Sequence, residues 1–366
     1  MRPLLLCFVA LSLHAAGPGE VVLNVEPSRE FPRHSEGAFA TLQDDRLLFV
    51  HTQFYGGASD HSAARLVART SSDGGRTWSP EPRTVLDNEG GANVMSVSLL
   101  RLQDGRLALF YLLKNTWMDC RPHVRFSSDE AATWSAPVRM TNAPGYFVLN
   151  NDRVIQLRSG RLVAPVAFHR ARGEDPDSSK SFDARALALW LVSDDAGATW
   201  SEAPQWQALP VPATRTGLQE PGVVELPDGS LFSWFRTDQG VQYEARSTDQ
   251  GRTWSAVAPG PMASPTSPAS LKLLPDGRLL GLWNDHGGEF DFIAGKRTPL
   301  VAALSRDGGR TWPVKKLIEP DPDGWYCYTA IHVHGDAVLL AYCAGDSKVG
   351  GLNRLRLRRL PLAELR

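Results

Sequence analysis

The sequence predicts an all-β protein, a six-bladed β-propeller built of four-stranded antiparallel blades. Two repeated patterns carry this prediction. The first is a polar motif, Ser-x-Asp-x-Gly-x-Thr-Trp, that occurs five times in a chain of 366 residues. Its copies lie at 71–79, 127–135, 193–201, 247–255 and 305–313, with Ala131 in place of glycine in the second copy. Self-similarity at such a period is typical of a repeat architecture.

The second pattern is an alternating apolar stretch that closes in a tight turn and continues as another apolar run, as in "VSLLRLQDGRLALFY". Asp-Gly or Ser-Gly between two such runs predicts a β-hairpin. The residue before the second strand of each hairpin falls at Asp45, Gly105, Gly160, Gly229, Gly277 and Asp336. Each unit is then a hairpin, a third strand, the polar motif as a turn, and a fourth strand. Six such units bury their faces by packing around a common axis.

The sixth unit lacks the polar motif and ends in "LNRLRLRRL". We expect "EVVLNVEP", near the start of the chain, to supply its missing outer strand. The polar motif itself is interpreted as scaffold. Its aspartate and hydroxyl side chains bond backbone groups within the turn, its glycine supplies an open backbone angle, and its tryptophan packs between strands.

Composition narrows the class of protein. The net charge is −1, which favours neither nucleic acid nor an anionic membrane as a partner. No His-Glu-x-x-His or paired Cys-x-x-Cys spacing is present, so we expect no metal and no cofactor. Residues 1–16 have the layout of a signal peptide, which predicts a secreted or periplasmic protein with a single domain over 17–366 and no membrane span. Cys327 and Cys343 are expected to face each other across a hairpin centred on Gly335.

In a propeller, the innermost strand of every blade starts at one rim of the central channel. The residues just before these strands, and those in the loops after each second strand, are therefore expected to converge. They include Arg33, Glu36, Asp60, His61, Asn151, Arg153, Glu220, Arg236, Arg297, Tyr326 and Tyr328. Carboxylates, arginines and tyrosines in one funnel indicate a site for an anionic sugar, hence a glycan or glycoconjugate partner.

With these repeats and this rim, the chain resembles the sialidase (neuraminidase) superfamily of glycoside hydrolases, whose repeats are called Asp-boxes. In "QEPGVVELPDGSLFSWFRTD", Glu220 and Arg236 match the glutamate of that family and an arginine of its substrate-binding triad. "YCYTAI" matches the nucleophile region at Tyr328, and "GKRTPLVAALSRDGG" offers Arg297 as the third triad arginine. "FYGGASDHSAARL" places Asp60 on the loop that carries the acid/base aspartate, which is mobile in the family.

One stretch departs from the family. Sialidases open their first blade with a Phe/Tyr-Arg-Ile-Pro motif whose arginine grips the substrate carboxylate. Here the stretch reads "FPRHSEGAF", with Ser35 and Glu36 in place of the arginine and Arg33 two residues earlier. Glu36 would oppose a carboxylate bound at that point.

The resemblance implies an exo-glycosidase for terminal sialic acid or a related acidic sugar. Tyr328 would be the nucleophile, because a neutral hydroxyl avoids the repulsion that a carboxylate meets at a carbon bearing a carboxylate. Glu220 would be its base, Asp60 the acid/base, and Arg236 and Arg297 the carboxylate clamp. The remaining rim residues would contact substrate, with Tyr326 sharing a face with Tyr328 because strand positions alternate.

Two alternatives stay open from the sequence. One is a carbohydrate-binding propeller without catalysis, which the departure at Glu36 favours. The other is a hydrolase or lyase for a different acidic sugar that uses Glu36, His61 or His169.

Overall fold

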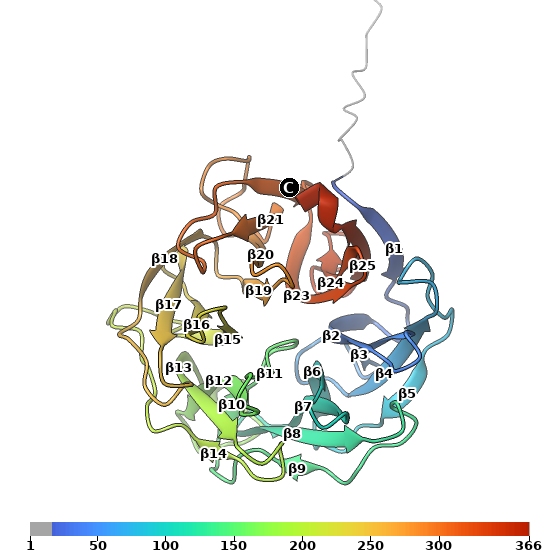
Figure 1. Cartoon of the computed structure of the whole chain (residues 1–366). Helices are drawn as coiled ribbons and strands as arrows, with labels where there is room; N and C mark the ends of the chain where they lie inside the picture. The colour runs from blue at the N-terminus through green and yellow to red at the C-terminus, as the bar shows by residue number, and fades with distance from the viewer. Residues whose placement is uncertain (1–16, 366) are drawn as a thin grey trace, which may run out of the picture.

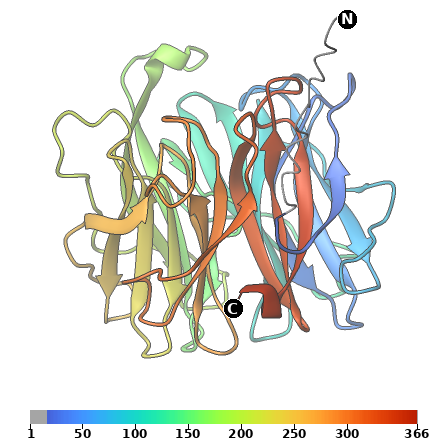
Figure 2. The ribbon, with the colours of Figure 1, turned by 90° about the horizontal axis from the view of Figure 1, so that it is seen from above.

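The computed structural model describes residues 17–365 as an all-β chain with two 3₁₀ turns, η1 (Ser179–Ser181) and η2 (Leu362–Leu365). The predicted signal peptide, 1–16, lies outside the described residues. The sheets stand around a common centre with their strands side by side (Figure 1), and seen at right angles the strands run between two opposite faces (Figure 2). Within the described part of the chain, no helix is long and apolar enough to cross a membrane.

Four of the sheets have four antiparallel strands each, and three of these follow the chain from strand to strand. The first is β2 (Arg33–Thr41), β3 (Leu47–Phe54), β4 (Ala64–Ser71) and β5 (Arg83–Leu86). Another is β15 (Gln219–Glu225), β16 (Leu231–Arg236), β17 (Val241–Ser247) and β18 (Ala258–Ala263). The next is β19 (Ser270–Leu273), β20 (Leu279–Asn284), β21 (Leu300–Ser305) and β22 (Lys315–Glu319).

The fourth of these sheets joins the two ends of the chain. Its order is β1 (Glu20–Val25), β25 (Leu355–Pro361), β24 (Ala337–Gly345) and β23 (Trp325–His334). The strand near the N-terminus therefore pairs with the last strand, from Glu20 opposite Arg359 to Val25 opposite Leu355. This confirms that "EVVLNVEP" supplies the outer strand of the sixth unit.

The second and third units form one sheet of nine strands. The second contributes β6 (Asn93–Arg101), β7 (Leu107–Thr116), β8 (Asp119–Ser127) and β9 (Val138–Arg139). The third contributes β10 (Tyr146–Val148), β11 (Ile155–Gln156), β12 (Leu162–Ala171), β13 (Phe182–Ser193) and β14 (Ser201–Glu202). A parallel pairing of Tyr146 with Cys120 links the two units. The described strands thus make five hydrogen-bonded sheets.

The polar motifs are turns held by their own side chains. In the first copy, Asp73 accepts hydrogen bonds from the Oγ of Ser71 (2.8 Å) and from the backbone N and Oγ1 of Thr77 (2.9 and 2.6 Å). The amide of Gly75 donates to the Ser71 Oγ, and Gly75 has a φ of 83°. Ala131 adopts a φ of 65° at the equivalent point, although it carries a Cβ. The scaffold interpretation of the motif is confirmed.

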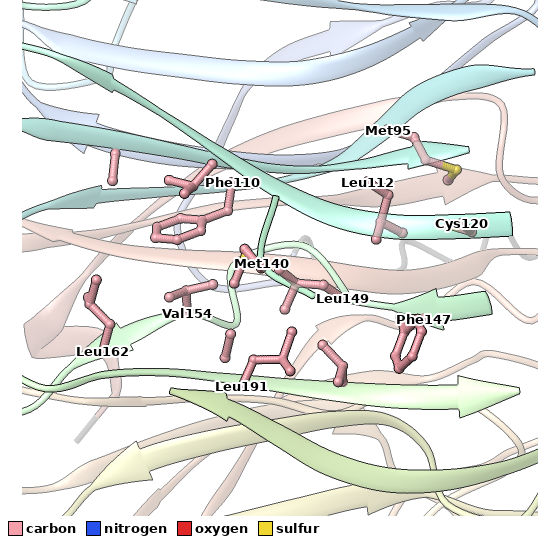
Figure 3. Close-up of a cluster of buried hydrophobic side chains, with 14 of the residues drawn as sticks. Met95, Phe110, Leu112, Cys120, Met140, Phe147, Leu149, Val154, Leu162 and Leu191 are labelled. Atoms are coloured by element: carbon pink, nitrogen blue, oxygen red, sulfur yellow. The ribbon is translucent and has the colours of Figure 1, made fainter. Parts of the chain in front are cut away.

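Apolar side chains fill the space between neighbouring sheets. Figure 3 shows one such cluster, in which Phe110 of β7 lies near Met140 and Leu162 in the space between the second and third units. The motif tryptophans add to this packing: Trp254 stacks on Trp190 of β13 with ring centroids 4.1 Å apart. Burial of this apolar surface is the main stabilising contribution to a fold of this kind.

Cys327 and Cys343 are direct partners across β23 and β24, as predicted. The hairpin centres between Gly335 and Asp336 and not on Gly335, and the bulge between Cys327 and Ala330 shifts the register so that the two cysteines face each other. Both are buried and carry free thiols.

Candidate active site

A cavity of about 310 Å³ opens where the innermost strands begin. Its wall comes from several sheets, because the starts of β2, β6, β15 and β23 and the loops beside them meet at this end. The lining residues are Glu36, Asp60, His61, Met95, Ser96, Leu112, Lys114, Trp117, Tyr146, Val148, Asn150, His169, Phe182, Gln219, Glu220, Arg236, Arg297, Tyr328 and Leu352. Acidic, basic and aromatic groups therefore share one small space.

A repeated backbone irregularity aims side chains at this cavity. Glu36, Ser96, Glu220 and Tyr328 have φ values of 54°, 61°, 46° and 59°, and Asp152 has 54° just before β11. In β2, β6, β15 and β23 the antiparallel register shifts at the same point, which marks a β-bulge. Left-handed backbone is costly for residues other than glycine, and it persists where the surrounding structure fixes it. Four of these five side chains line the cavity.

Glu220, Tyr328, Arg236 and Arg297 form one cluster. The hydroxyl of Tyr328 donates to Glu220 Oε1 (3.1 Å), and Arg236 Nη1 donates to the same oxygen (2.5 Å). The Arg297 guanidinium lies 5.4 Å from the centre of the Tyr328 ring. Within residues 17–365, the Nε and Nη1 atoms of Arg297 find no hydrogen-bond partner, although the residue is only 8% exposed. Buried donors of this kind suit an anionic ligand.

The protonation states of this cluster follow from its charges. Burial would raise the pKa of Glu220, but the cations of Arg236 and Arg297 outweigh it and lower the pKa below its ordinary value. Burial, followed by the charge of Glu220, raises the pKa of Tyr328 well above the ordinary value for tyrosine. The resting pair is therefore a carboxylate that accepts a hydrogen bond from a neutral phenol.

A second polar cluster lies around Arg33, which is 1% exposed. Its Nη2 donates to Glu36 Oε1 (3.2 Å) and its Nη1 to Asp60 Oδ1 (2.5 Å). The Ser96 hydroxyl donates to the other oxygen of Glu36. Burial raises the pKa of Glu36, and the charge of Arg33 opposes that rise. The carboxyl group of Glu36 thus lies in the first sheet, at the stretch where the family resemblance implies an arginine.

An aromatic wall completes the cavity. His61 stacks on Trp117 with ring centroids 3.5 Å apart, and the Tyr146 hydroxyl lies 3.3 Å from His61 Nε2. His169 stacks on Phe182, with centroids 4.6 Å apart. Burial lowers the pKa of both histidines to about 4, so both rings are neutral near pH 7. Trp117, Tyr146 and Phe182 were not predicted from the sequence: Trp117 lies in the short turn between β7 and β8, and Tyr146 and Phe182 are the first residues of β10 and β13.

Eight of the residues predicted from the sequence line the cavity: Tyr328, Glu220, Asp60, Arg236, Arg297, Glu36, His61 and, from the alternative hydrolase or lyase hypothesis, His169. Four do not: Arg33, Asn151, Arg153 and Tyr326. Arg33 lies behind the wall and acts on Glu36 and Asp60, as described above. The other three side chains were predicted to contact substrate, but they lie outside the cavity.

Tyr326 lies in the hydrophobic core beside Tyr342, with ring centroids 6.4 Å apart, and is 4% exposed. The alternation rule that put it on one face with Tyr328 holds only in a regular strand. The bulge between Cys327 and Ala330 breaks the alternation, so the two tyrosines point to different surroundings.

Asn151 and Arg153 are buried beneath the cavity, where they connect separate units. Asn151 Nδ2 donates to the backbone oxygen of Tyr328 (3.0 Å) and so supports the strained residue from below. Arg153 donates to the backbone oxygen of Ala269 (2.7 Å) and to Ser270 Oγ (3.2 Å). Both side chains are aimed inward, as predicted, but they end in protein contacts.

No group of three or more His, Cys, Asp and Glu side chains among residues 17–365 is arranged to hold a metal ion. The titratable side chains that line the cavity are carboxyl groups, two arginines, a lysine, two histidines and the phenols of Tyr146 and Tyr328.

The BNR repeat-like domain model matches residues 52–340. A sialidase from Micromonospora viridifaciens is 26% identical over 343 residues, which cover 84% of this chain and 50% of the sialidase. A sialidase from Paraclostridium sordellii is 26% identical over 247 residues, 60% of this chain and 56% of that protein. The chain thus spans about half the length of these relatives.

Solved structures share the fold. A protein of unknown function from Dyadobacter fermentans superposes with a TM-score of 0.71 at 18% identity, over 93% of this chain and 99% of that one. The NanB sialidase from Streptococcus pneumoniae gives 0.70 at 15% identity, over 95% and 71% of the two chains. The match of the family model over residues 52–340, most of the chain, shows that the chain belongs to the BNR repeat-like domain family.

Proposed function

We propose that this chain is an exported glycoside hydrolase of sialidase type, which removes a terminal sialic acid or a related acidic sugar from a glycan. The observation that carries the proposal is the contact of the Tyr328 hydroxyl with Glu220 Oε1, at 3.1 Å, beside the unpartnered donors of Arg297. A nucleophile and a base within hydrogen-bond reach are the signature of covalent catalysis. The sialidase relatives support the same reading at low identity.

In the first step, the Tyr328 oxygen would attack the anomeric carbon while its proton passes to Glu220. The bond from that carbon to the leaving oxygen breaks, and Asp60 gives the leaving oxygen its proton. In the second step, Asp60 takes a proton from water, the water oxygen bonds to the anomeric carbon, and the electron pair returns to Tyr328. Glu220 returns the proton to Tyr328, so the residues end as they began.

The charge pattern limits the substrate to one main anionic group. Arg236 and Arg297 offer donors on the side of Tyr328, where a carboxylate on the reacting carbon would lie. Glu36 also lines the cavity, and its carboxyl group would repel a second carboxylate placed beside it. The ligand that fits best carries its carboxylate at the arginines and neutral groups toward Glu36.

The six-bladed propeller predicted from the sequence is part of the same proposal. Counting the nine-stranded sheet as two units joined by the Tyr146–Cys120 pairing gives six blades around one axis. The cavity then lies at the channel entrance, where all six innermost strands begin. We take the described chain as a single domain on the same ground.

Substituting Tyr328→Phe tests the catalytic proposal. It deletes one hydroxyl, so turnover of a fluorogenic sialoside should fall by about 10³-fold or more, as expected when the nucleophile of a catalytic unit is lost. Tyr326→Phe is the matched control, because that ring lies in the core and should leave turnover unchanged.

Full turnover by the Tyr328→Phe variant would overturn the mechanism. Binding of sialosides by the wild-type protein without any hydrolysis would instead favour the carbohydrate-binding alternative, which the carboxyl group of Glu36 supports. Hydrolysis of a uronate glycoside, tested in the same panel, would identify a different acidic sugar as substrate.

A further inference from the structure

The loop of residues 55–63, between β3 and β4, carries Asp60 to the edge of the cavity. The Asp60 side chain is 59% exposed, as expected for a loop at the surface. The polar atoms of the loop are nonetheless held from beneath by side chains that are almost fully buried. They come from three different strands, β2, β6 and β7.

Arg33 of β2 makes the first attachment. Its Nη1 donates to Asp60 Oδ1 (2.5 Å) and to the backbone oxygen of Ala58 (3.2 Å). Its guanidinium packs over the ring of Phe54, 4.5 Å from the centroid, and its Nη2 is engaged by Glu36. These contacts fix the guanidinium in one orientation, so the Asp60 carboxylate is bound to a rigid partner.

Asn93 of β6 and Lys114 of β7 make the second and third attachments to the loop. Asn93 Nδ2 donates to the backbone oxygens of Asp60 (2.9 Å) and Ser62 (2.8 Å). Lys114 Nζ donates to the Asp60 oxygen as well (2.7 Å). Asn93 is 0% exposed and Lys114 is 3% exposed. Releasing the loop would take these backbone partners away from two buried donors, which is unfavourable for the amide of Asn93 and more so for the charged ammonium of Lys114.

We propose that Arg33, Asn93 and Lys114 are positioning residues that hold Asp60 at the cavity before substrate arrives. The proposal rests on the proposed acid/base function of Asp60. The family resemblance implies a mobile loop at this point, whereas here the loop is fixed from below, and Arg33, three residues before Glu36, is one of the residues that fix it.

The attachment has a measurable consequence for acidity. Desolvation by the surrounding protein would raise the pKa of Asp60, but the charges of Arg33 and Lys114 outweigh this effect and lower the pKa below its ordinary value. Asp60 is then protonated only at acid pH, so activity that needs its proton falls as the pH rises through that low pKa. Removing the charge of Arg33 should raise the pKa of Asp60, and the fall in activity with rising pH should then occur at higher pH.

Hydrogen exchange of the full chain tests the attachment without any substrate. In Arg33→Met and Asn93→Ala, amides in residues 55–63 should exchange at least tenfold faster than in the wild type, while strand amides keep their protection. Arg69→Met is the control, because Arg69 is also buried in this sheet but donates to the backbone oxygens of Ser79 and Pro80. Unchanged exchange in both loop variants would overturn the proposal.

Kinetics test the positioning of Asp60. Arg33→Met should lower kcat/KM by about 10²-fold on sialosides with a poor leaving group, since a misplacement of about 1 Å has such an effect. The loss of kcat/KM, which reports the first step, should be much smaller with an activated aryl leaving group, which needs no proton. In an Asp60→Asn background, Arg33→Met should add little further loss. Equal losses for both leaving groups, or fully additive losses, would overturn the positioning role.

These measurements separate the two proposals. If the wild-type chain hydrolyses no glycoside, the proposed function fails, while hydrogen exchange still decides whether the loop is fixed. Should Arg33→Met fail to fold, Asn93→Ala provides the same comparison from a different strand.

Discussion

Removing the charge of Glu220 should move substrate turnover and ligand affinity in opposite directions. In the Glu220→Gln variant, the amide oxygen still accepts the hydrogen bonds of Tyr328 and Arg236, which keeps the local geometry. The amide cannot take the proton of Tyr328, so kcat should fall by about 10²–10⁴-fold, the usual contribution of a general base.

The affinity change follows from the charges in the cluster. Arg236 and Arg297 carry two positive charges against the single negative charge of Glu220, whose Oε1 is 2.5 Å from Arg236 Nη1. A ligand carboxylate on the far edge of these guanidinium groups would lie on the order of 6 Å from Glu220. At an effective dielectric constant of about 20, the repulsion between the two carboxylates is then about 3 kcal/mol. Allowing for screening by water and salt, affinity for free sialic acid should rise about tenfold to hundredfold.

Calorimetric titration with free sialic acid, beside the kinetics on a sialoside, checks both changes. Glu244→Gln is the control, because Glu244 pairs with Arg246 on β17 instead of lining the cavity. Weaker binding to the Glu220→Gln variant than to the wild type would refute the assignment of the two arginines as a carboxylate clamp. Unchanged kcat would refute the assignment of Glu220 as the base.

Three further predictions concern the scaffold. Gly222→Ala would place a Cβ 2.1 Å from a ring carbon of Trp234, and this overpacking should lower the free energy of unfolding by about 1–3 kcal/mol, measured with urea. Hydrogen bonding, foremost from Thr77, lowers the pKa of Asp73 from 3.8 to about 2, so its stabilising contribution is present above pH 3.8 and is lost as the pH falls toward 2. Melting temperatures below pH 4 should therefore fall less steeply for Asp73→Asn than for the wild type, and equal slopes would contradict this. The buried thiols of Cys327 and Cys343 should react with a thiol reagent only on unfolding, and rapid reaction in the native state would argue against their burial.

Much of the fold was predictable because the residues that determine its turns lie close together in the sequence. The hairpin turns and the Ser-x-Asp-x-Gly-x-Thr-Trp turns depend on side chains within nine residues of each other, and each copy repeats the same contacts. The pairing of the N-terminal strand followed from counting, since the last unit lacked a strand. The link between the second and third units was not predictable, because the Tyr146–Cys120 pairing joins segments that share no motif.

The candidate site was predictable where position along an innermost strand was enough. Glu220, Arg236, Arg297 and Tyr328 meet as expected from their places before or after the inner strands. Tyr326 was misplaced because a bulge has no simple mark in the sequence: nothing in "YCYTAI" indicates that Tyr328 adopts a positive φ. Of the aromatic wall, His61 and His169 were predicted, but Trp117, Tyr146 and Phe182 were not, because they lie in a strand-to-strand turn and at the starts of β10 and β13, which no repeat motif marks.

The bulges link the scaffold to the chemistry. A regular inner strand would alternate its side chains between the two neighbouring sheets and aim none of them along the axis. A left-handed residue at the start of the strand turns one side chain out of this alternation, toward the space that the sheets share. Because four inner strands carry that irregularity at equivalent points, Glu36, Ser96, Glu220 and Tyr328 converge although 292 positions separate the first from the last. A change of residue at such a point would alter the chemistry of the cavity without altering the sheets, and the carboxyl group of Glu36, where the family resemblance implies an arginine, would be such a change.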